Sequence, residues 1–437
     1  MRSVEAATRH DVWKPRPRWA GIVSKRRGAE WILVGLVVAL ALPYALAGPR
    51  IILDDWFFLR NAHFDGAFSA GGARQLMGRP GAWLVYAFQF GIVGRRPLAL
   101  YVLQTAANAA VAVALLVAAR RFLDRGVAFA VAAVWVALPN HSSLSRWFST
   151  LPAVVALLLV LIGLLVLDTG RRPWLATACF AAAAVSYEAV IPAAMAALVV
   201  VPLFRRRRLD AQILGSLLAL ALITEWLWSH RLYPDVHRAD LGVLFPIHFG
   251  PGIASVLPAG VVLAMVAAVG ITVALVRLAV PSFRSPAGRP EGMIAIGLGI
   301  IGVGSAAFIR WPWTVTGIND RANVIGSIGA ATAWVGIGLL LLRVRREVAL
   351  AGVIVAAAFV LPAHHQRDLD YRRAGDDALR ALAAAKAAPL GPGRTVDLPS
   401  TVIRSHHETY GLFDWMAPHA VQLVRDDPTV TARFIRG

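Results

Sequence analysis

The chain has 437 residues, of which 58% are hydrophobic and 16% are charged, with a net charge of +19 and a mean hydropathy of +0.62. Soluble domains are nearer half apolar and a quarter charged, so this composition excludes an ordinary soluble globular protein. The arginines cluster at the ends of long apolar runs, as expected where basic loops orient helices in a bilayer, so the positive charge does not indicate nucleic-acid binding.

Apolar segments of membrane-spanning length recur along most of the chain. They predict an all-α polytopic membrane protein with about 11 transmembrane helices. The expected spans are residues 30–48, 97–119, 127–139, 151–167, 174–188, 190–204, 211–229, 255–280, 292–309, 322–342 and 347–362.

The arginine clusters set the expected orientation. Three basic residues at 25–27 precede the first span, so the N-terminal segment 1–29 is predicted to be cytoplasmic. Every dense arginine cluster except the one at 95–96 then falls in a cytoplasmic loop, as the positive-inside rule requires. The predicted parts after the N-terminal segment are a transmembrane domain at 30–362, with a long first outer loop at 49–96, and a small extracytoplasmic region at 363–437.

The first outer loop begins with the stretch RIILDDWFFLRNA, which places Asp54 and Asp55 between aliphatic and aromatic residues. Carboxylates avoid apolar surroundings unless something offsets the cost. The pair either caps a surface helix, or includes a general base or a metal ligand held beside a lipid phosphate. Because adjacent carboxylates repel, one of them can have a raised pKa. Trp56, Phe57 and Phe58 would anchor the loop helix at the membrane interface.

A second part of this loop, residues 82–93, is apolar but too short to cross a bilayer as a helix. Arg79 precedes it, and Arg95 and Arg96 follow it. An interfacial or re-entrant helix is therefore expected, and the whole loop is expected to lie on the membrane surface.

Other ionisable residues at the outer ends of the spans are costly in a membrane and call for an explanation. Glu188, in SYEAVIP, lies at a predicted outer turn between two short spans, where it either pairs structurally or faces a site. Arg310 and Arg321 bracket WPWTVTGIND in another outer loop. They are either interfacial arginines or phosphate ligands, since the planar arginine fork suits phosphate. Arg60 and Arg79 complete the candidate substrate-binding residues.

The rest of the chain narrows the chemistry. A single cysteine, Cys179, excludes an intramolecular disulfide. No P-loop or dinucleotide fingerprint is present, so the chemistry is not driven by ATP within this chain. The histidine pairs at 364–365 and 406–407 match no known metal spacing and are interpreted as exposed loop residues. In the tail, residues 376–388 are helix-like and residues 395–398 are strand-like.

Four short motifs, in this order and on one expected side of the membrane, resemble those of the GT-C superfamily of polytopic glycosyltransferases. The motifs are the acidic pair Asp54-Asp55 after the first span, Arg79-Pro80 at the start of a horizontal helix, the loop PNHSSLSRWFS from Pro139, and SYEAVIP with Glu188 and Pro192. The likeness is closest to protein O-mannosyltransferase-like members, including the tetratricopeptide-containing ones. It covers residues 30–205, and Tyr187 stands where these proteins often have lysine.

This resemblance implies a glycosyltransferase that moves a sugar from a polyprenyl-phosphate donor to a glycan, lipid or protein acceptor on the outer face of the cell membrane. Asp54 or Asp55 would deprotonate the acceptor hydroxyl, and arginine or a divalent cation would offset the charge on the departing phosphate. No residue is assigned as a metal ligand. Two other classes stay open: a polytopic transporter or lipid flippase, and a catalytically inactive envelope-assembly protein on the same fold.

Overall fold

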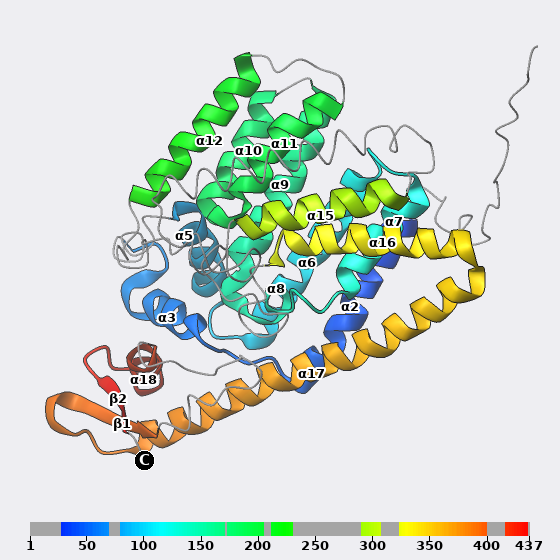
Figure 1. Cartoon of the computed structure of the whole chain (residues 1–437). Helices are drawn as coiled ribbons and strands as arrows, with labels where there is room; N and C mark the ends of the chain where they lie inside the picture. The colour runs from blue at the N-terminus through cyan, green and yellow to red at the C-terminus, as the bar shows by residue number, and fades with distance from the viewer. Residues whose placement is uncertain are drawn as a thin grey trace, which may run out of the picture.

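The computed structural model describes residues 28–69, 79–170, 173–204, 211–229, 290–306, 323–399 and 416–435. Within these ranges the chain is mostly helical, and it contains one two-stranded sheet. Figure 1 shows helices that pack into a bundle, with one long helix running along its side to the C-terminal strands.

The elements carry the labels of Figure 1. The α-helices are α2 (Gly28–Ala47), α3 (Asp54–Asn61), α5 (Pro80–Tyr86), α6 (Pro97–Ala119), α7 (Arg125–Ala137), α8 (Ser143–Arg146), α9 (Leu151–Thr169), α10 (Pro173–Ser186), α11 (Ile191–Phe204), α12 (Ala211–Ser229), α15 (Pro290–Ala306), α16 (Gly326–Val344), α17 (Arg346–Ala387) and α18 (Ala417–Arg425). Short π- or 3-10 turns are η1 (Ala62–Gly66), η2 (Ala87–Val93), η3 (Phe148–Thr150), η4 (Glu188–Val190) and η7 (Pro392–Arg394). The strands are β1 (Thr395–Pro399) and β2 (Thr431–Ile435).

Five helical segments of the described residues are long and apolar enough to cross a membrane: Gly28–Ala47, Pro97–Ala119, Phe148–Thr169, Gly326–Val344 and Arg346–Ala387. Spanning the hydrocarbon core takes about 20 apolar residues, and helices such as α7 and α10, with 13 and 14 residues, are shorter. The helical content and the apolar segments agree with the expected helical membrane protein. Helices occupy each expected span except 255–280, which lies outside the described residues.

The main hydrophobic core lies between α2, α6, α7, α9, α10, α11 and α16. Its largest side chain, Trp135 of α7, donates from Nε1 to Ser327 Oγ of α16 at 2.9 Å. Two glycines bring α15 and α16 together, because a Cβ on Gly297 would lie only 2.5 Å from the carbonyl oxygen of Gly329. Small residues that let backbones approach closely are typical of helix packing in membranes.

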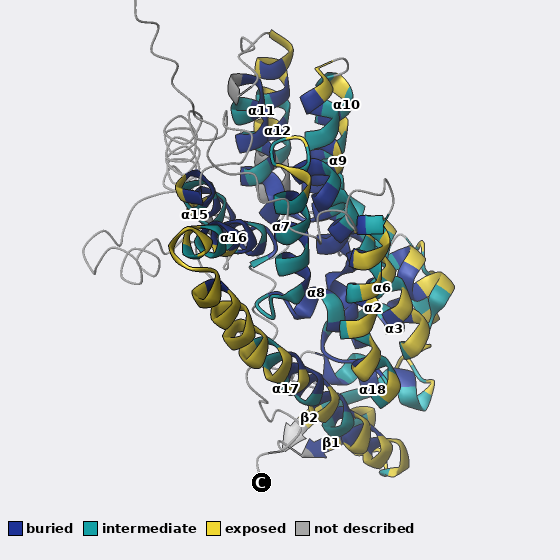
Figure 2. Cartoon of the chain, turned by 90° about the vertical axis from the view of Figure 1, so that its right-hand side faces the viewer, coloured by how far each residue is buried: buried dark blue, intermediate teal, exposed yellow. Residues whose placement is uncertain are grey.

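The helix α17 has 42 residues and continues through position 362, where the last expected span ended. Its first half is apolar and exposed, as Val353, Ile354 and Phe359 show with exposed fractions of 65%, 62% and 74%. Figure 2 shows that the second half alternates between buried and exposed residues, so that one face of it is buried. The helix expected at 376–388 is therefore the end of α17. Pro362 removes one backbone hydrogen bond, and the packed turns beyond it keep the helix continuous.

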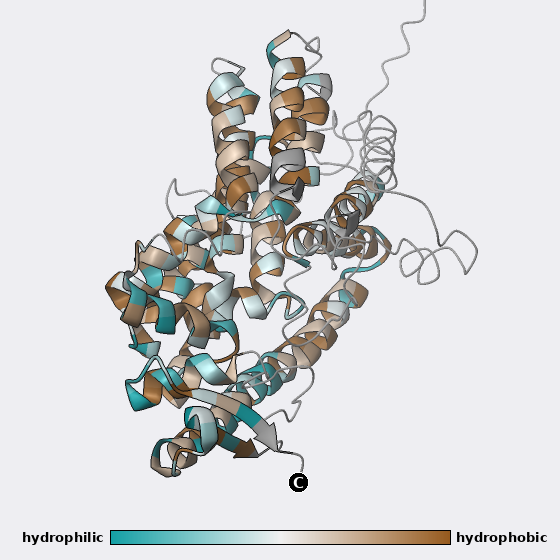
Figure 3. Ribbon diagram, turned by 90° about the vertical axis from the view of Figure 1, so that its left-hand side faces the viewer, coloured by the Kyte–Doolittle hydropathy of each residue, from teal (hydrophilic) through white to brown (hydrophobic). Residues whose placement is uncertain are grey.

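The strand expected in the tail is confirmed as β1, which pairs in parallel with β2. α18 lies between the two strands in the chain, and we call β1, α18 and β2 the C-terminal unit. Val396 and Val421 of this unit belong to a second hydrophobic core that also contains Trp56 and Phe148. The C-terminal unit thus shares its core with the first predicted outer loop. Figure 3 shows hydrophilic residues gathered around this unit and hydrophobic ones along the bundle helices.

Candidate functional site

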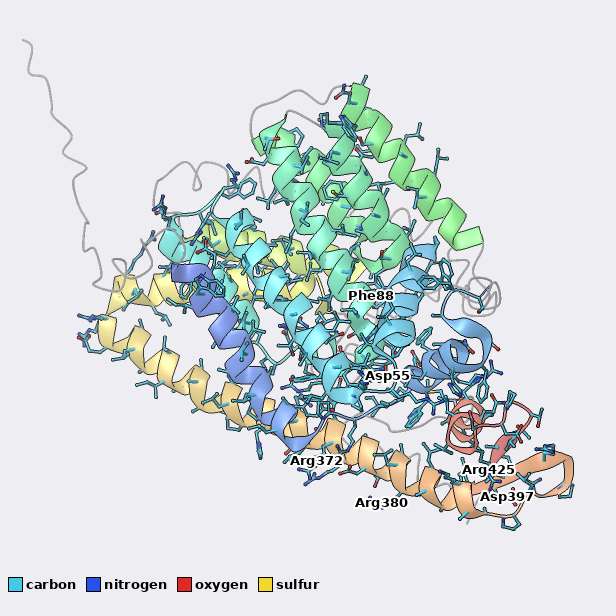
Figure 4. The ribbon with its side chains drawn as sticks, turned by 180° about the vertical axis from the view of Figure 1, so that it is seen from behind. Asp55, Phe88, Arg372, Arg380, Asp397 and Arg425 are labelled. Carbon is cyan, nitrogen blue, oxygen red and sulfur yellow. The ribbon has the colours of Figure 1, made fainter. Side chains whose placement is uncertain are left out.

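The Asp55 carboxyl joins two segments that lie 94 residues apart in the chain. Asp55 stands in the first turn of α3 and is fully buried. Its Oδ1 accepts hydrogen bonds from the backbone N–H of Ser149 at 2.8 Å and from the Ser149 hydroxyl at 2.5 Å. Its Oδ2 accepts one from the N–H of Ile52 at 3.2 Å. One carboxyl therefore holds the start of α3 against η3, at the centre of the molecule in Figure 4.

Asp54 has a different environment, although it is adjacent to Asp55. Consecutive residues of a helix diverge by about 100°, and Asp54 is only partly buried. The acidic pair is thus divided into a buried member bound to Ser149 and a member that reaches the surface.

The residue before the pair has a strained backbone. Leu53 has φ 50° and ψ −130°, a conformation that residues with a side chain rarely adopt. Its side chain is fully buried, so the surrounding packing holds this conformation in place. Such strain costs about 1–3 kcal/mol and clusters at functional sites.

Burial raises the pKa of Asp55 to about 8, because desolvation disfavours the charged carboxylate. The hydrogen bonds from Ser149 and from the Ile52 N–H lower this pKa in part, and the charge of Asp54 raises it. A carboxyl with this pKa holds its proton at neutral pH, whereas an ordinary aspartate, with a pKa near 3.9, is charged.

A further part of the chain, α5 and η2, also binds the loop that contains Ser149. Tyr86, at the end of α5, donates its hydroxyl to the carbonyl oxygen of Ser149 at 2.8 Å. Gln89 of η2 is fully buried and donates from Nε2 to the carbonyl oxygen of Phe148 at 2.8 Å. The backbone of η3 is therefore held by α3 and by α5–η2 at once.

The other face of α5–η2 is apolar and exposed. Leu84, Phe88 and Ile92 follow one another at helical spacing, with exposed fractions of 55%, 48% and 67%; Phe88 is labelled in Figure 4. The 14 residues of Pro80–Val93 are too few to span a bilayer as a helix. This arrangement agrees with the interfacial element expected at 82–93.

Arg79 and Glu188, two of the predicted substrate-binding residues, form an ion pair between Nη2 and Oε1. The Arg79 guanidinium also lies over the Tyr187 ring, 5.7 Å from its centroid. Gly81 allows this approach, because a Cβ there would lie 2.4 Å from Ser186 Oγ and 2.9 Å from its backbone nitrogen. The start of α5 is thus fixed against the junction of α10 and η4.

The candidate site has two parts, the Arg79–Glu188 ion pair and the Asp55–Ser149 contact, and α5 connects them. Its seven residues span roughly 10 Å, with the Arg79–Glu188 pair at the beginning and Tyr86, bound to Ser149, at the end. A helix of this length is a short, rigid spacer between a cationic group and a pair of carboxyl groups.

Polar side chains of α6 fix the loop that carries Ser149. Gln104 and Asn108 donate their side-chain amides to the carbonyl oxygen of Leu144, at 2.6 Å and 2.7 Å. Gln104 also donates to Thr150 Oγ1 at 3.1 Å. Both side chains are buried in a helix long enough to span a membrane, where a polar group needs such a partner.

Arg146 ties the same loop to α17. Its Nε donates to Asp368 Oδ1 at 2.5 Å, and its Nη2 lies 3.2 Å from His364 Nδ1. His364 Nε2 is 2.9 Å from the carbonyl oxygen of Ala137. His364 is buried in a helix, so its interpretation as an exposed loop residue is wrong. Buried residues at 364, 367, 368 and 371 follow a helical period, but three of the four are ionisable, so apolar periodicity could not have revealed their burial.

Arg60, also predicted to bind substrate, contacts the C-terminal unit. Its Nε donates to Gln422 Oε1 of α18 at 2.8 Å, and its Nη1 pairs with Asp65. A role of Arg60 in substrate binding stays a prediction. Arg310 and Arg321 lie outside the described residues.

The aromatic run after the acidic pair packs on protein. Trp56 is 5% exposed, Phe58 stacks on Tyr86, and Phe57 meets His419 edge to face at 4.8 Å between ring centroids. The prediction that Trp56 anchors in the membrane is therefore wrong. Phe57, Phe58 and Tyr86 help to line a pocket of about 30 Å³ between α3 and α5, enough for one water molecule.

Ser149, Tyr86 and Gln89 were not among the predicted site residues. Ser149 is the last residue of the motif PNHSSLSRWFS, and Gln89 interrupts an apolar segment. A polar residue inside an apolar interfacial helix is the signal that could have identified Gln89. Within the described ranges, no group of three or more His, Cys, Asp or Glu residues is placed to hold a metal ion.

A search against the models of known protein families gives no match, and a search of curated proteins gives none either.

Proposed function

We propose that the chain is a GT-C-type membrane glycosyltransferase that transfers a sugar from a polyprenyl-phosphate donor to a glycan, lipid or protein acceptor at the outer face of the cell membrane. One observation carries the proposal. The acidic pair directly after the first apolar helix is divided between a buried carboxyl that joins two distant segments and a partly exposed carboxyl beside it.

Asp54 is the proposed general base. A base must come within hydrogen-bond reach of the proton that it removes, and Asp54 is the member of the pair that is partly exposed. Asp55 already accepts three hydrogen bonds and is closed off from solvent, so its proposed role is to hold α3 in place. The acceptor oxygen would then attack the anomeric carbon, and the lipid phosphate would leave.

Arg79 is the proposed ligand of that phosphate. Its side chain is 41% exposed, and it gives Glu188 a bond from Nη2. Arginine has five N–H donors, so further donors can meet phosphate oxygens, and the positive charge offsets the charge that grows as the phosphate leaves. Glu188 orients the guanidinium. Among the other predicted arginines, Arg60 is engaged with Gln422.

A lipid-linked donor suits the position of the site beside α5–η2. The exposed side chains of Leu84, Phe88 and Ile92 form an apolar stripe next to α6, whose Leu98 and Val102 are also exposed. Such a stripe buries in the headgroup and acyl boundary of a leaflet. The polyprenyl tail would stay in the bilayer while the headgroup reaches Arg79.

The first experiment measures turnover of a polyprenyl-phosphate-linked sugar by the full chain in lipid nanodiscs, without ATP. Asp54→Asn should lower turnover by about 10²–10⁴-fold, the usual contribution of a general base. Asp124→Asn is the control, because Asp124 precedes α7 and makes no capping hydrogen bond. Full turnover in Asp54→Asn would reject the assignment, and a strict requirement for ATP would favour a transporter. Mass spectrometry of envelope glycans with and without the chain would then identify the sugar and the acceptor.

The proposed topology has about 11 spans, a cytoplasmic N-terminus and the acidic pair outside. In a cysteine-free background made by Cys179→Ala, Arg95→Cys should react with a membrane-impermeant thiol reagent on intact cells. Arg125→Cys should react only after permeabilisation. Both side chains belong to exposed residues. Reaction of both cysteines on intact cells would break this topology.

A further inference from the structure

The polar half of α17 contacts both segments that meet at Asp55 and Ser149. One segment is the linker between α2 and α3, which contains Arg50 and leads to Asp55. The other is the loop with α8, which contains Arg146 and leads to Ser149. Each segment carries an arginine that pairs with an aspartate of α17.

The first contact joins Arg50 to Asp376. Arg50 Nε lies 2.6 Å from Asp376 Oδ1, and Arg50 Nη1 donates to the carbonyl oxygen of Gly48 at 2.7 Å. Arg372, labelled in Figure 4, lies 3.7 Å from the other oxygen of Asp376. Arg50 thus links Asp376 of α17 to the backbone of the linker between α2 and α3.

Gly375 makes room for this contact. A Cβ at this position would lie 2.2 Å from Arg50 Cβ and 2.6 Å from Arg50 Cγ. The stem of Arg50 therefore rests directly on the α17 backbone. The linker is held by this steric fit as well as by the charge pair.

The second contact joins Arg146 to Asp368, and it is more deeply buried. The side chains are 3% and 9% exposed, and Arg146 Nε lies 2.5 Å from Asp368 Oδ1. Removing one partner of a buried pair leaves an uncompensated buried charge, which is strongly destabilising. This contact fixes the loop three residues before Ser149.

The two aspartates lie eight residues apart on one helix, which is roughly 12 Å. A rigid helix thus holds the two arginines at a set separation, and the chain beyond each arginine continues to the Asp55–Ser149 contact. Arg50 is five positions from Asp55, and Arg146 is three positions from Ser149, so short stretches of chain connect each ion pair to that contact.

We propose that Asp368 and Asp376 are positioning residues, which hold the two segments so that the N–H and hydroxyl of Ser149 stay on the Asp55 carboxyl. Neither aspartate touches substrate in this account; they act through Arg146 and Arg50. The effect of these two aspartates on turnover rests on the proposed function. Their effect on the Asp55–Ser149 contact can be tested without any transferase activity.

The test is hydrogen–deuterium exchange on the full chain in nanodiscs, with Asp376→Asn, Asp368→Asn and the control Asp377→Asn. Asp377 lies next to Asp376 but pairs with Arg380 of the same helix. Asp376→Asn and Asp368→Asn should each speed exchange of the Ser149 amide about tenfold, as expected when a hydrogen bond to a carboxyl is weakened. Exchange in α9 beyond its first turn should stay unchanged, and Asp377→Asn should match the parent.

Two further readouts keep the proposal falsifiable. Asp376 is one-third exposed, so its variant should fold even if Asp368→Asn does not, and Gly375→Ala should reproduce it by displacing Arg50. The carboxyl infrared band of Asp55, identified by its loss in Asp55→Asn, should titrate at higher pH in these variants, because the Ser149 donors favour the charged form. General destabilisation alone would not shift that titration.

The outcomes separate the two proposals. Unchanged Ser149 exchange and unchanged Asp55 titration in Asp376→Asn and Gly375→Ala would overturn the positioning role, whatever the turnover. Faster Ser149 exchange in these variants, together with no sugar transfer by the parent protein, would support the positioning role and reject the proposed function. If transfer occurs, Asp376→Asn should lower kcat and leave KM unchanged.

Discussion

Arg79 and Glu188, 109 positions apart in the chain, form an ion pair at the start of α5. The pair connects the first predicted outer loop with the turn between α10 and α11. Because α5 ends at Tyr86, which binds Ser149, the pair also sets where the far end of the site lies.

The first prediction concerns this pair. Arg79→Lys keeps a positive charge but loses the planar fork that can bind Glu188 and a phosphate together. We expect KM for the lipid-linked donor to rise about tenfold or more, with a smaller change in kcat, measured by donor consumption in nanodiscs. Arg380→Lys is the matched control, since Arg380 pairs with Asp377 of the same helix and its side chain is 75% exposed. An unchanged KM in Arg79→Lys would remove Arg79 from the donor site.

The second prediction follows from the pKa of Asp55, which burial raises to about 8. An unfolded aspartate has a pKa near 3.9, so between about pH 4 and pH 8 the folded protein holds a proton that the unfolded chain releases. The contribution of Asp55 to the free energy of unfolding should therefore be fully present below about pH 4 and be lost as the pH rises to about 8. Thermal unfolding of the full chain, followed by tryptophan fluorescence across this range, measures the effect.

Asp55→Asn supplies the comparison for that titration. The amide carries no charge at any of these pH values, so the fall in unfolding temperature between pH 5 and pH 8 should be smaller in the variant than in the parent. An equal fall in both proteins would show that Asp55 does not titrate in this range.

The sequence could predict the helices more readily than their contacts. Apolar runs identified α6 at both ends, because length and hydropathy alone define an apolar helix. The end of α17 could not be found in this way, since only one face of its polar half is buried, by contacts with distant segments. Hydropathy identifies the residues that avoid water, but it does not identify the segments that pack against them.

The site was predictable residue by residue but not as an arrangement. Asp55, Arg79 and Glu188 were singled out because charged groups are costly near apolar segments. The pairing of Arg79 with Glu188, and of Asp55 with Ser149, depends on contacts across 109 and 94 positions. Nothing in local sequence marks a serine as the partner of a distant carboxyl.

The third prediction concerns Ser149. Ser149→Ala keeps the backbone N–H bond to Asp55 and removes the hydroxyl bond, since those are separate donors. We expect a loss of about 1–3 kcal/mol in the free energy of unfolding. The pKa of Asp55 should rise further, because the Ser149 hydroxyl lowers it. Thermal unfolding and the infrared titration of the Asp55 carboxyl measure the two effects.

Ser145→Ala is the matched control for this change. Ser145 lies in the same loop, and its hydroxyl donates to the Ser142 carbonyl oxygen at 2.9 Å and accepts from Arg146 Nη1 at 3.0 Å, with no bond to Asp55. We expect Arg146 to stay in place in this variant, because its Nε still pairs with the buried Asp368. Ser145→Ala should leave the Asp55 titration unchanged. A similar shift in both variants would mean that the loop as a whole, and not the Ser149 hydroxyl, sets the pKa.

The fourth prediction tests the close approach of α5 to α10. Gly81→Ala would place a Cβ 2.9 Å from the Ser186 backbone nitrogen and 3.0 Å from its Cα, where the backbone cannot easily yield. Overpacking of this kind costs about 1–3 kcal/mol, and moving α5 away from α10 should also weaken the Arg79–Glu188 pair. We expect lower thermal stability and an increased donor KM in the same variant. Gly35→Ala is the control, because nothing lies within 4 Å of its added Cβ in α2 and alanine favours the helix. Should Gly81→Ala match Gly35→Ala in stability and KM, the fit of α5 against Ser186 would not be what holds Arg79 in place.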